Sequence, residues 1–169
     1  MTQHELEARI KRLEDIEEIK NLQARYCYFI DTLQMDKVPD LFAENFIAEY
    51  VPMATFKTRA ELMEFLKGAD EGSSMMCHQA MTPLIEVDGD KATGTWYLFG
   101  PFTNYLPKGE VANWVQGRYD NDYVRENGKW KFSHLRFKFN IQSPYEDGWV
   151  KKRMMLRNEK ATSQKRKRI

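Results

Sequence analysis

The stretch RYDNDYVRENGKWKFS, residues 118–133, carries the strongest fold signal in the chain. Apolar and polar residues alternate on both sides of Asn127-Gly128, and this dipeptide is the preferred centre of a two-residue β-hairpin turn. The pattern extends outward and predicts one strand at 111–126 and a second at 129–142. We therefore expect a long antiparallel hairpin at this point.

The same strand-like pattern begins earlier in the sequence, near residue 73. Segments 74–87 and 91–104 have strand character, and Asp88-Gly89 between them is another hairpin signal. Because the strands are long, the sheet that they form must twist and curve.

The first 70 residues have helical periodicity instead. Apolar residues at three- and four-residue spacing, from Leu13 to Leu33, predict a long helix that ends near Leu33. A short helix at 36–44 and a strand at 46–52 are expected next. Thr58 and Glu61 then match a capping box, which predicts a third helix that runs over 59–67 and stops at Gly68.

Helices followed by a meander of long strands indicate an α+β domain. We expect a cone-shaped, curved antiparallel sheet wrapped around three N-terminal helices, with a pocket inside the cone. The predicted domain covers residues 1–145. Residues 146–169 form a C-terminal segment, in which Asp147–Lys160 has the pattern of a short helix and the end, ATSQKRKRI, is expected to fray.

The net charge of +1 conceals an asymmetry along the 169 residues. Residues 151–169 contain nine basic residues and one acidic residue, whereas residues 1–150 contain 17 basic and 24 acidic ones. The chain is thus an acidic domain with a basic tail. Such a tail is usually just solvated, so the pattern does not favour nucleic acid as a partner.

Composition excludes several classes of protein. Cys27 and Cys77 do not form a C-x-x-C motif, so neither a zinc site nor a disulfide framework is expected, and a reducing, cytoplasmic location is favoured. The start of the chain lacks the apolar region of a signal peptide, and no apolar run is long enough to span a membrane. No phosphate-binding loop, nucleophile elbow or HExxH motif is present, and we expect neither a cofactor nor a metal.

Polar residues within apolar elements are the remaining signal. Asp31 lies at the end of the first helix, where the helix dipole disfavours an acid, and His78 lies among apolar residues of an expected strand. A lone histidine on such a strand is more often a satisfied core residue. If Asp31 met His78, however, the pair would make a general base, because the carboxylate fixes the tautomer of the ring. His134, on the last strand, is a competing candidate.

Three stretches of the sequence carry a resemblance to known proteins. IEEIKNLQARYCYFID (16–31), MMCHQAMTPLIEV (75–87) with ATGTWYL (92–98), and RYDNDYVRENGKWKFS (118–133) resemble the SnoaL-like, or nuclear-transport-factor-2-like, superfamily. Within that superfamily the pattern is most similar to the bile acid 7α-dehydratases, and more distantly to the scytalone dehydratases and hexachlorocyclohexane dehydrochlorinases. The superfamily contains enzymes, binding modules and structural subunits.

The resemblance assigns roles to individual residues. Asp31 and His78 fall on the catalytic dyad of those enzymes, Tyr26 falls on a catalytic-pocket tyrosine, and Tyr50 falls on a second tyrosine that binds substrate. Trp96, in the WYL motif, is also expected at the substrate.

The chain departs from the dehydratase pattern in two places. Gly100 stands where an acidic residue is expected, so the role of that acid is unfilled. A pocket arginine aligns near Arg136 to Lys138, which share a strand face with His134, and all three are expected to bind substrate.

The resulting prediction is a cofactor-independent lyase, such as a dehydratase, or an isomerase that acts on a hydrophobic, cyclic or steroid-like carbonyl compound. A ligand-binding module without catalysis and the structural β-subunit of a ring-hydroxylating dioxygenase are the alternatives. The resemblance further implies a homo-oligomer, with a trimer favoured over a dimer. No membrane partner is expected.

Overall fold

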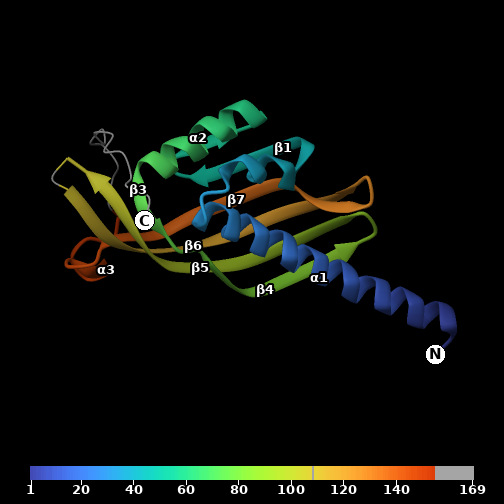
Figure 1. Ribbon diagram of the computed structural model, residues 1–169. Coiled ribbons are helices and arrows are strands. Elements are labelled where there is room, and N and C mark those ends of the chain that lie inside the picture. Colours follow the sequence, from blue (N-terminus) through green and yellow to red (C-terminus); the bar gives the residue numbers. More distant parts are fainter. Residues whose placement is uncertain (108, 155–169) are drawn as a thin grey trace.

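The sheet dominates the structure of the chain (Figure 1). The computed structural model describes residues 1–107 and 109–154. Helix α1 (Gln3–Asp31) crosses one face of the sheet, and the shorter helix α2 (Arg59–Glu71) lies apart from it, against η1 (Met35–Leu41) and β3 (Ser73–Met76). The elements in chain order are α1 (Gln3–Asp31), the 3-10 helix η1 (Met35–Leu41), β1 (Phe42–Val51), β2 (Ala54–Phe56), α2 (Arg59–Glu71), β3 (Ser73–Met76), β4 (Gln79–Asp88), β5 (Lys91–Leu106), β6 (Gly109–Glu126), β7 (Lys129–Pro144) and α3 (Gly148–Lys151).

Both predicted hairpins are present. Strands β6 and β7 are joined at Asn127 and Gly128, whose φ angles of 50° and 76° lie in the left-handed region that the two-residue turn requires. Strands β4 and β5 are joined through Gly89, whose φ angle is 59°. In the second hairpin Asp88 still pairs with Lys91, so the turn residues are Gly89 and Asp90, and only the glycine of the Asp-Gly signal needs a positive φ.

The strand order is β2-β1-β7-β6-β5-β3, and β4 pairs with β5 on the same edge as β3. The expected curved α+β fold is therefore confirmed, with one correction. The sheet is mixed rather than fully antiparallel, because β1 pairs with β7 in parallel. Hairpin signals report only pairs of neighbouring strands, whereas β1 and β7 are far apart in the sequence and need a long connection.

Three predicted boundaries also shift. Helix α1 ends at Asp31, and Leu33 adopts a φ angle of 61° beyond it. The expected helix at 36–44 is a 3-10 turn that gives way to β1 at Phe42. Helix α2 passes through Gly68 and ends at the next glycine, Gly72, because one glycine inside a helix costs only about 1 kcal/mol.

A fourth difference shapes the site. The strand expected at 74–87 is divided into β3 and β4, and Cys77 and His78 lie between them. The two halves pair with different parts of the long strand β5. The histidine is thus at a break in the strand and not within its ladder.

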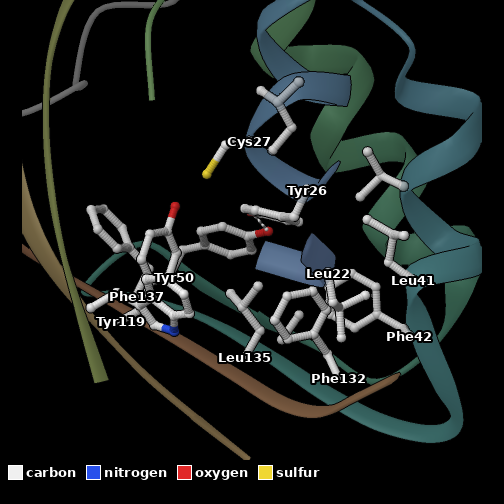
Figure 2. Close-up of a cluster of buried hydrophobic side chains, with 14 of the residues drawn as sticks. Leu22, Tyr26, Cys27, Leu41, Phe42, Tyr50, Tyr119, Phe132, Leu135 and Phe137 are labelled. Atoms are coloured by element: carbon white, nitrogen blue, oxygen red, sulfur yellow. Dashed lines mark hydrogen bonds between the residues drawn. The ribbon is translucent and has the colours of Figure 1, made fainter. Parts of the chain in front are cut away.

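The core lies between α1 and the concave face of the sheet and is largely aromatic (Figure 2). Tyr26 of α1 is 1% exposed, and its ring makes edge contacts with Phe42, Tyr119 and Phe132 at 5.7–6.4 Å between centroids. This packing fixes the orientation of the C-terminal half of α1. The N-terminal half extends past the sheet, and Leu13 there is exposed.

The C-terminal segment is only partly described. Within the described part of the expected helix Asp147–Lys160, residues 147–154, there is the single turn α3, and Met154 forms a bridge with Gln142 of β7. Residues 155–160 of that expected helix lie outside the described residues. The expected frayed end, ATSQKRKRI, lies outside the described residues. Among the described residues, no helix is long and apolar enough to cross a membrane.

Candidate active site

A cavity of about 90 Å³ lies between the concave face of the sheet and the helices. Its wall is mainly apolar and comes from α1, α2 and strands β1, β3, β5, β6 and β7. The side chains that line it are Tyr26, Ile30, Tyr50, Met53, Phe65, Leu66, Ala69, Ser73, Met76, His78, Leu98, Phe102, Asn104, Val115, Tyr119, Phe137, Phe139 and Gln142.

His78 reaches this cavity because of the break between β3 and β4. The carbonyl oxygen of Cys77 packs directly against Gly100 of β5, in the space that a Cβ atom would need. Position 100 therefore has no room for the acid that the dehydratase pattern has there. The glycine instead lets the segment that carries His78 lie against the sheet.

Asp31 binds His78 through two hydrogen bonds. One carboxylate oxygen, Oδ1, lies 2.6 Å from the imidazole Nδ1, and the other, Oδ2, accepts the backbone N–H of His78 at 2.8 Å. The side chains are 24% and 12% exposed, so the pair is partly shielded from water. The ring also makes an edge contact with Phe102, at 4.9 Å between centroids. The structure thus brings together the two residues that the sequence singled out.

This geometry selects one form of the imidazole. A carboxylate accepts a proton from Nδ1, so the neutral ring carries its hydrogen there and leaves the lone pair on Nε2. Nε2 is then free to take a proton from a ligand, and the carboxylate stabilises the resulting imidazolium. The arrangement is chemically suited to general base catalysis.

Tyr26 and Tyr50 form a second polar pair on the cavity wall. Their hydroxyl oxygens lie 2.8 Å apart, and both rings are buried (Figure 2). Burial raises the pKa of Tyr26 well above its usual value and also raises the pKa of Tyr50. Both phenols therefore keep their protons at neutral pH. Since one hydroxyl donates to the other, the pair has one proton left to donate to a ligand oxygen.

Trp96 does not line this cavity. Its indole N–H donates to the hydroxyl of Tyr123 at 3.0 Å, inside the core. The ring borders a shallow hollow on the other side of the dyad, which Lys20 and Cys27 also line. The dyad therefore lies between the cavity and this outer hollow.

His134, Arg136 and Lys138 lie on the opposite face of β7 from the cavity. They alternate with Leu135, Phe137 and Phe139, and it is the last two of these that line it. His134 and Arg136 both contact Glu49 of β1, at 3.1 and 2.5 Å.

The sequence placed the three polar residues correctly on one face but assigned that face to the pocket. The apolar alternation of this strand is what marks its inner face.

Several polar residues of the wall were not expected from the sequence. Asn104 and Gln142 are the last residues of the strands expected at 91–104 and 129–142, and Ser73 directly precedes the strand expected at 74–87, so none of them was singled out. The signal available for Asn104 was its phase, since it shares the face of Leu98 and Phe102 on β5.

Comparisons with known proteins agree with this architecture. The family model described as a SnoaL-like domain matches residues 11–136. The chain belongs to the SnoaL-like family. The matched range includes Asp31, His78 and the three tyrosines of the cavity wall, Tyr26, Tyr50 and Tyr119.

Solved structures share the fold of this SnoaL-like protein. A protein of unknown function from Mycobacterium tuberculosis is 25% identical, with a TM-score of 0.65 over 81% of this chain and 77% of that one. A provisionally assigned scytalone dehydratase from Novosphingobium aromaticivorans is 17% identical, with a TM-score of 0.72 over 92% and 97%. A hexachlorocyclohexane dehydrochlorinase, LinA-type3, from Novosphingobium barchaimii is 20% identical, with a TM-score of 0.70 over 80% and 92%.

Proposed function

We propose that this SnoaL-like protein abstracts a proton next to the carbonyl group of a small, neutral, hydrophobic compound and so catalyses an elimination or an isomerisation. The observation that carries the proposal is the 2.6 Å contact between Asp31 and the Nδ1 atom of His78, beside an apolar cavity. A histidine fixed in this way is a base without needing a metal or cofactor to activate it.

The proposed chemical step uses both polar pairs of the cavity wall. Nε2 of His78 takes the proton, and the electron pair of the C–H bond moves to the carbonyl oxygen as an enolate. The free proton of the Tyr26–Tyr50 pair stabilises that negative charge. The electron pair then either expels a leaving group from the next carbon or accepts the proton back at a different carbon. The first course is an elimination, and the second is an isomerisation.

The cavity favours a compound with a single ring over a steroid. A cavity of about 90 Å³ is smaller than the ~150 Å³ apolar cavity that holds benzene in an engineered protein. A one-ring substrate would fill it and reach its mouth, whereas a steroid nucleus would extend far outside. The lining also contains no lysine or arginine among the described residues, which favours a neutral substrate.

Deuterium exchange tests the proton-abstraction step without knowledge of the natural leaving group. The purified protein is mixed with cyclohexanone in D₂O, and the loss of the α-proton signal is followed by NMR. We expect exchange above the buffer rate, and a loss of about 10²–10⁴-fold in His78→Ala. His134→Ala is the matched control and is expected to exchange at the wild-type rate, since His134 lies on the other face of the sheet.

The same assay separates the alternatives. Binding of the ketone without any exchange would identify a ligand-binding module and reject the catalytic proposal. Equal exchange rates in wild type and His78→Ala would show that another group is the base.

A further inference from the structure

The wall of the cavity has a second polar region that the proposed proton transfer does not use. It consists of Ser73 of β3 and Asn104 of β5, which both line the cavity, and of Asn113 of β6 behind them. All three side chains belong to residues that are at most 4% exposed. Polar groups are costly to bury in an apolar wall, so their presence calls for an explanation.

The region lies farther along β5 than the point where the strand contacts His78. Asn104 is two residues along β5 from Phe102, the ring that contacts His78. Two residues of a strand span about 7 Å. A ligand that has its reacting carbon at His78 can therefore extend along β5 to this second region.

The hydrogen bonds of the region all run in one direction. The amide of Asn113 donates to Oδ1 of Asn104 at 2.9 Å, and the amide of Asn104 donates to Oγ of Ser73 at 2.8 Å. Both amide orientations are fixed independently, because Asn113 also donates to the carbonyl of Val111 and Asn104 to that of Gly72.

Ser73 is the last member of this chain. Its oxygen accepts from Asn104, and its own proton takes part in no hydrogen bond within the described residues. A hydroxyl that accepts from such a chain is polarised and becomes a better donor. The cavity wall thus offers one buried O–H donor here, in addition to the one from the tyrosine pair.

We propose that Ser73, held by Asn104 and Asn113, binds a second oxygen atom of the substrate. The substrate is then a neutral ring compound with two acceptor oxygens on opposite sides: a carbonyl at the tyrosine pair and a carbonyl or ether oxygen at Ser73. A carboxylate is disfavoured, because the lining has no cation among the described residues. This assignment rests on the proposed function for the position of the first oxygen.

Two ketones of equal size test the assignment. 4-Methoxycyclohexanone and 4-ethylcyclohexanone differ only by an ether oxygen in place of a methylene group. Their dissociation constants are measured by NMR titration for the wild type, Ser73→Ala and the control Ser133→Ala. Ser133 borders a hollow on the outside of the molecule. Ser73→Ala is expected to fold, since the Asn104 amide keeps the Gly72 carbonyl as its acceptor.

The measured quantity is the preference for the ether, the ratio of the dissociation constants of the ethyl and methoxy ketones. We expect this ratio to be about 3- to 10-fold higher in the wild type than in Ser73→Ala, the range of one hydrogen bond. Ser133→Ala should keep the wild-type ratio. Equal ratios in wild type and Ser73→Ala, or a wild type that binds neither ketone, would overturn the assignment.

The two experiments distinguish a failure of the proposed proton abstraction from a failure of the second oxygen site. A ratio that depends on Ser73, together with no deuterium exchange in either ketone, would support the second oxygen site and reject the proton abstraction. The reverse result, exchange that needs His78 with a ratio indifferent to Ser73, would leave the proposed function and remove the second site.

Discussion

Among the described residues, two histidines each contact a carboxylate, one on each face of the sheet. His78 and Asp31 lie 2.6 Å apart at the cavity, and His134 and Glu49 lie 3.1 Å apart on the outer face. The exposures are similar: 12% and 19% for the two histidine side chains, and 24% and 25% for the two carboxylates. Contact and burial alone therefore do not distinguish a candidate catalytic pair from a surface ion pair.

The difference lies in what else the groups touch. Glu49 also binds the guanidinium of Arg136, and the second ring nitrogen of His134 lies 3.7 Å from Asp122. Both nitrogens of His134 thus face carboxylates, and neither is left for a ligand. Among the ion pairs of the described residues, Asp31 takes part only in the one with His78. This contact occupies Nδ1 of the ring, so Nε2 is free. A base requires an unoccupied nitrogen at a cavity.

Of the substitutions that test this difference, Asp31→Asn should change the rate of deuterium exchange most. The amide can still contact the ring, but it cannot stabilise the imidazolium and does not enforce the tautomer with its proton on Nδ1. We expect the deuterium exchange of cyclohexanone to fall about 10²–10⁴-fold, as in His78→Ala.

Glu49→Gln is the matched control on the outer face and should exchange at the wild-type rate. If both substitutions slowed exchange equally, the two pairs would not differ in function.

Removing a tyrosine hydroxyl should cause the next largest loss of deuterium exchange. In Tyr50→Phe the hydroxyl pair loses one member, and the enolate loses part of its stabilisation. We expect about a 10²-fold loss of exchange. Tyr123→Phe is the control, because the hydroxyl of Tyr123 binds Trp96 and Asn121 away from the cavity. A Tyr50→Phe variant as fast as Tyr123→Phe would show that the tyrosine pair only supports the fold.

The sequence predicted one of the two pairs and the general form of the fold. Periodicity located the helices, and positive-φ turn residues located the hairpins, because both signals are local. The meeting of Asp31 and His78 was predicted only through family resemblance, since the two residues are 47 positions apart.

Other features depend on long-range packing and left no local trace. The parallel pairing of β1 with β7 is one. The inward face of β7 did have a local signal, its apolar alternation, and assigning the polar face to the pocket put His134 and Arg136 there. The break at Cys77 and His78 is a second feature without a local signal, because it depends on a glycine 23 residues after Cys77.

That glycine gives a prediction about stability. In Gly100→Ala the new methyl group would overlap the carbonyl oxygen of Cys77, so the segment before His78 must move. We expect a loss of about 1–3 kcal/mol in the free energy of unfolding, measured by urea denaturation. Gly68→Ala is the control, since nothing lies within 4 Å of the place that its new methyl group would take, and the substitution should stabilise helix α2. Equal stability of the two variants would contradict the packing argument.

Disrupting the outer pair of His134 and Glu49 should cause the smallest change, a small loss in the free energy of unfolding. The hydrogen bond from Arg136 is the main cause that lowers the pKa of Glu49, and it outweighs the partial burial that raises it. A lowered pKa in the folded state means that the pair stabilises the protein above the unfolded pKa of about 4.3, and that this stability disappears as the pH falls through the folded value.

Glu49→Gln should therefore lower the free energy of unfolding by less than about 1 kcal/mol at pH 7 and by almost nothing at pH 3. Urea denaturation at both pH values measures this, with Glu64→Gln on the exposed face of α2 as the control. A difference that persists at pH 3 would mean that Glu49 acts through packing and not through its charge. The outer pair would then stabilise the fold by packing, as core residues do. The free Nε2 atom of His78 would be the one remaining difference between the two pairs.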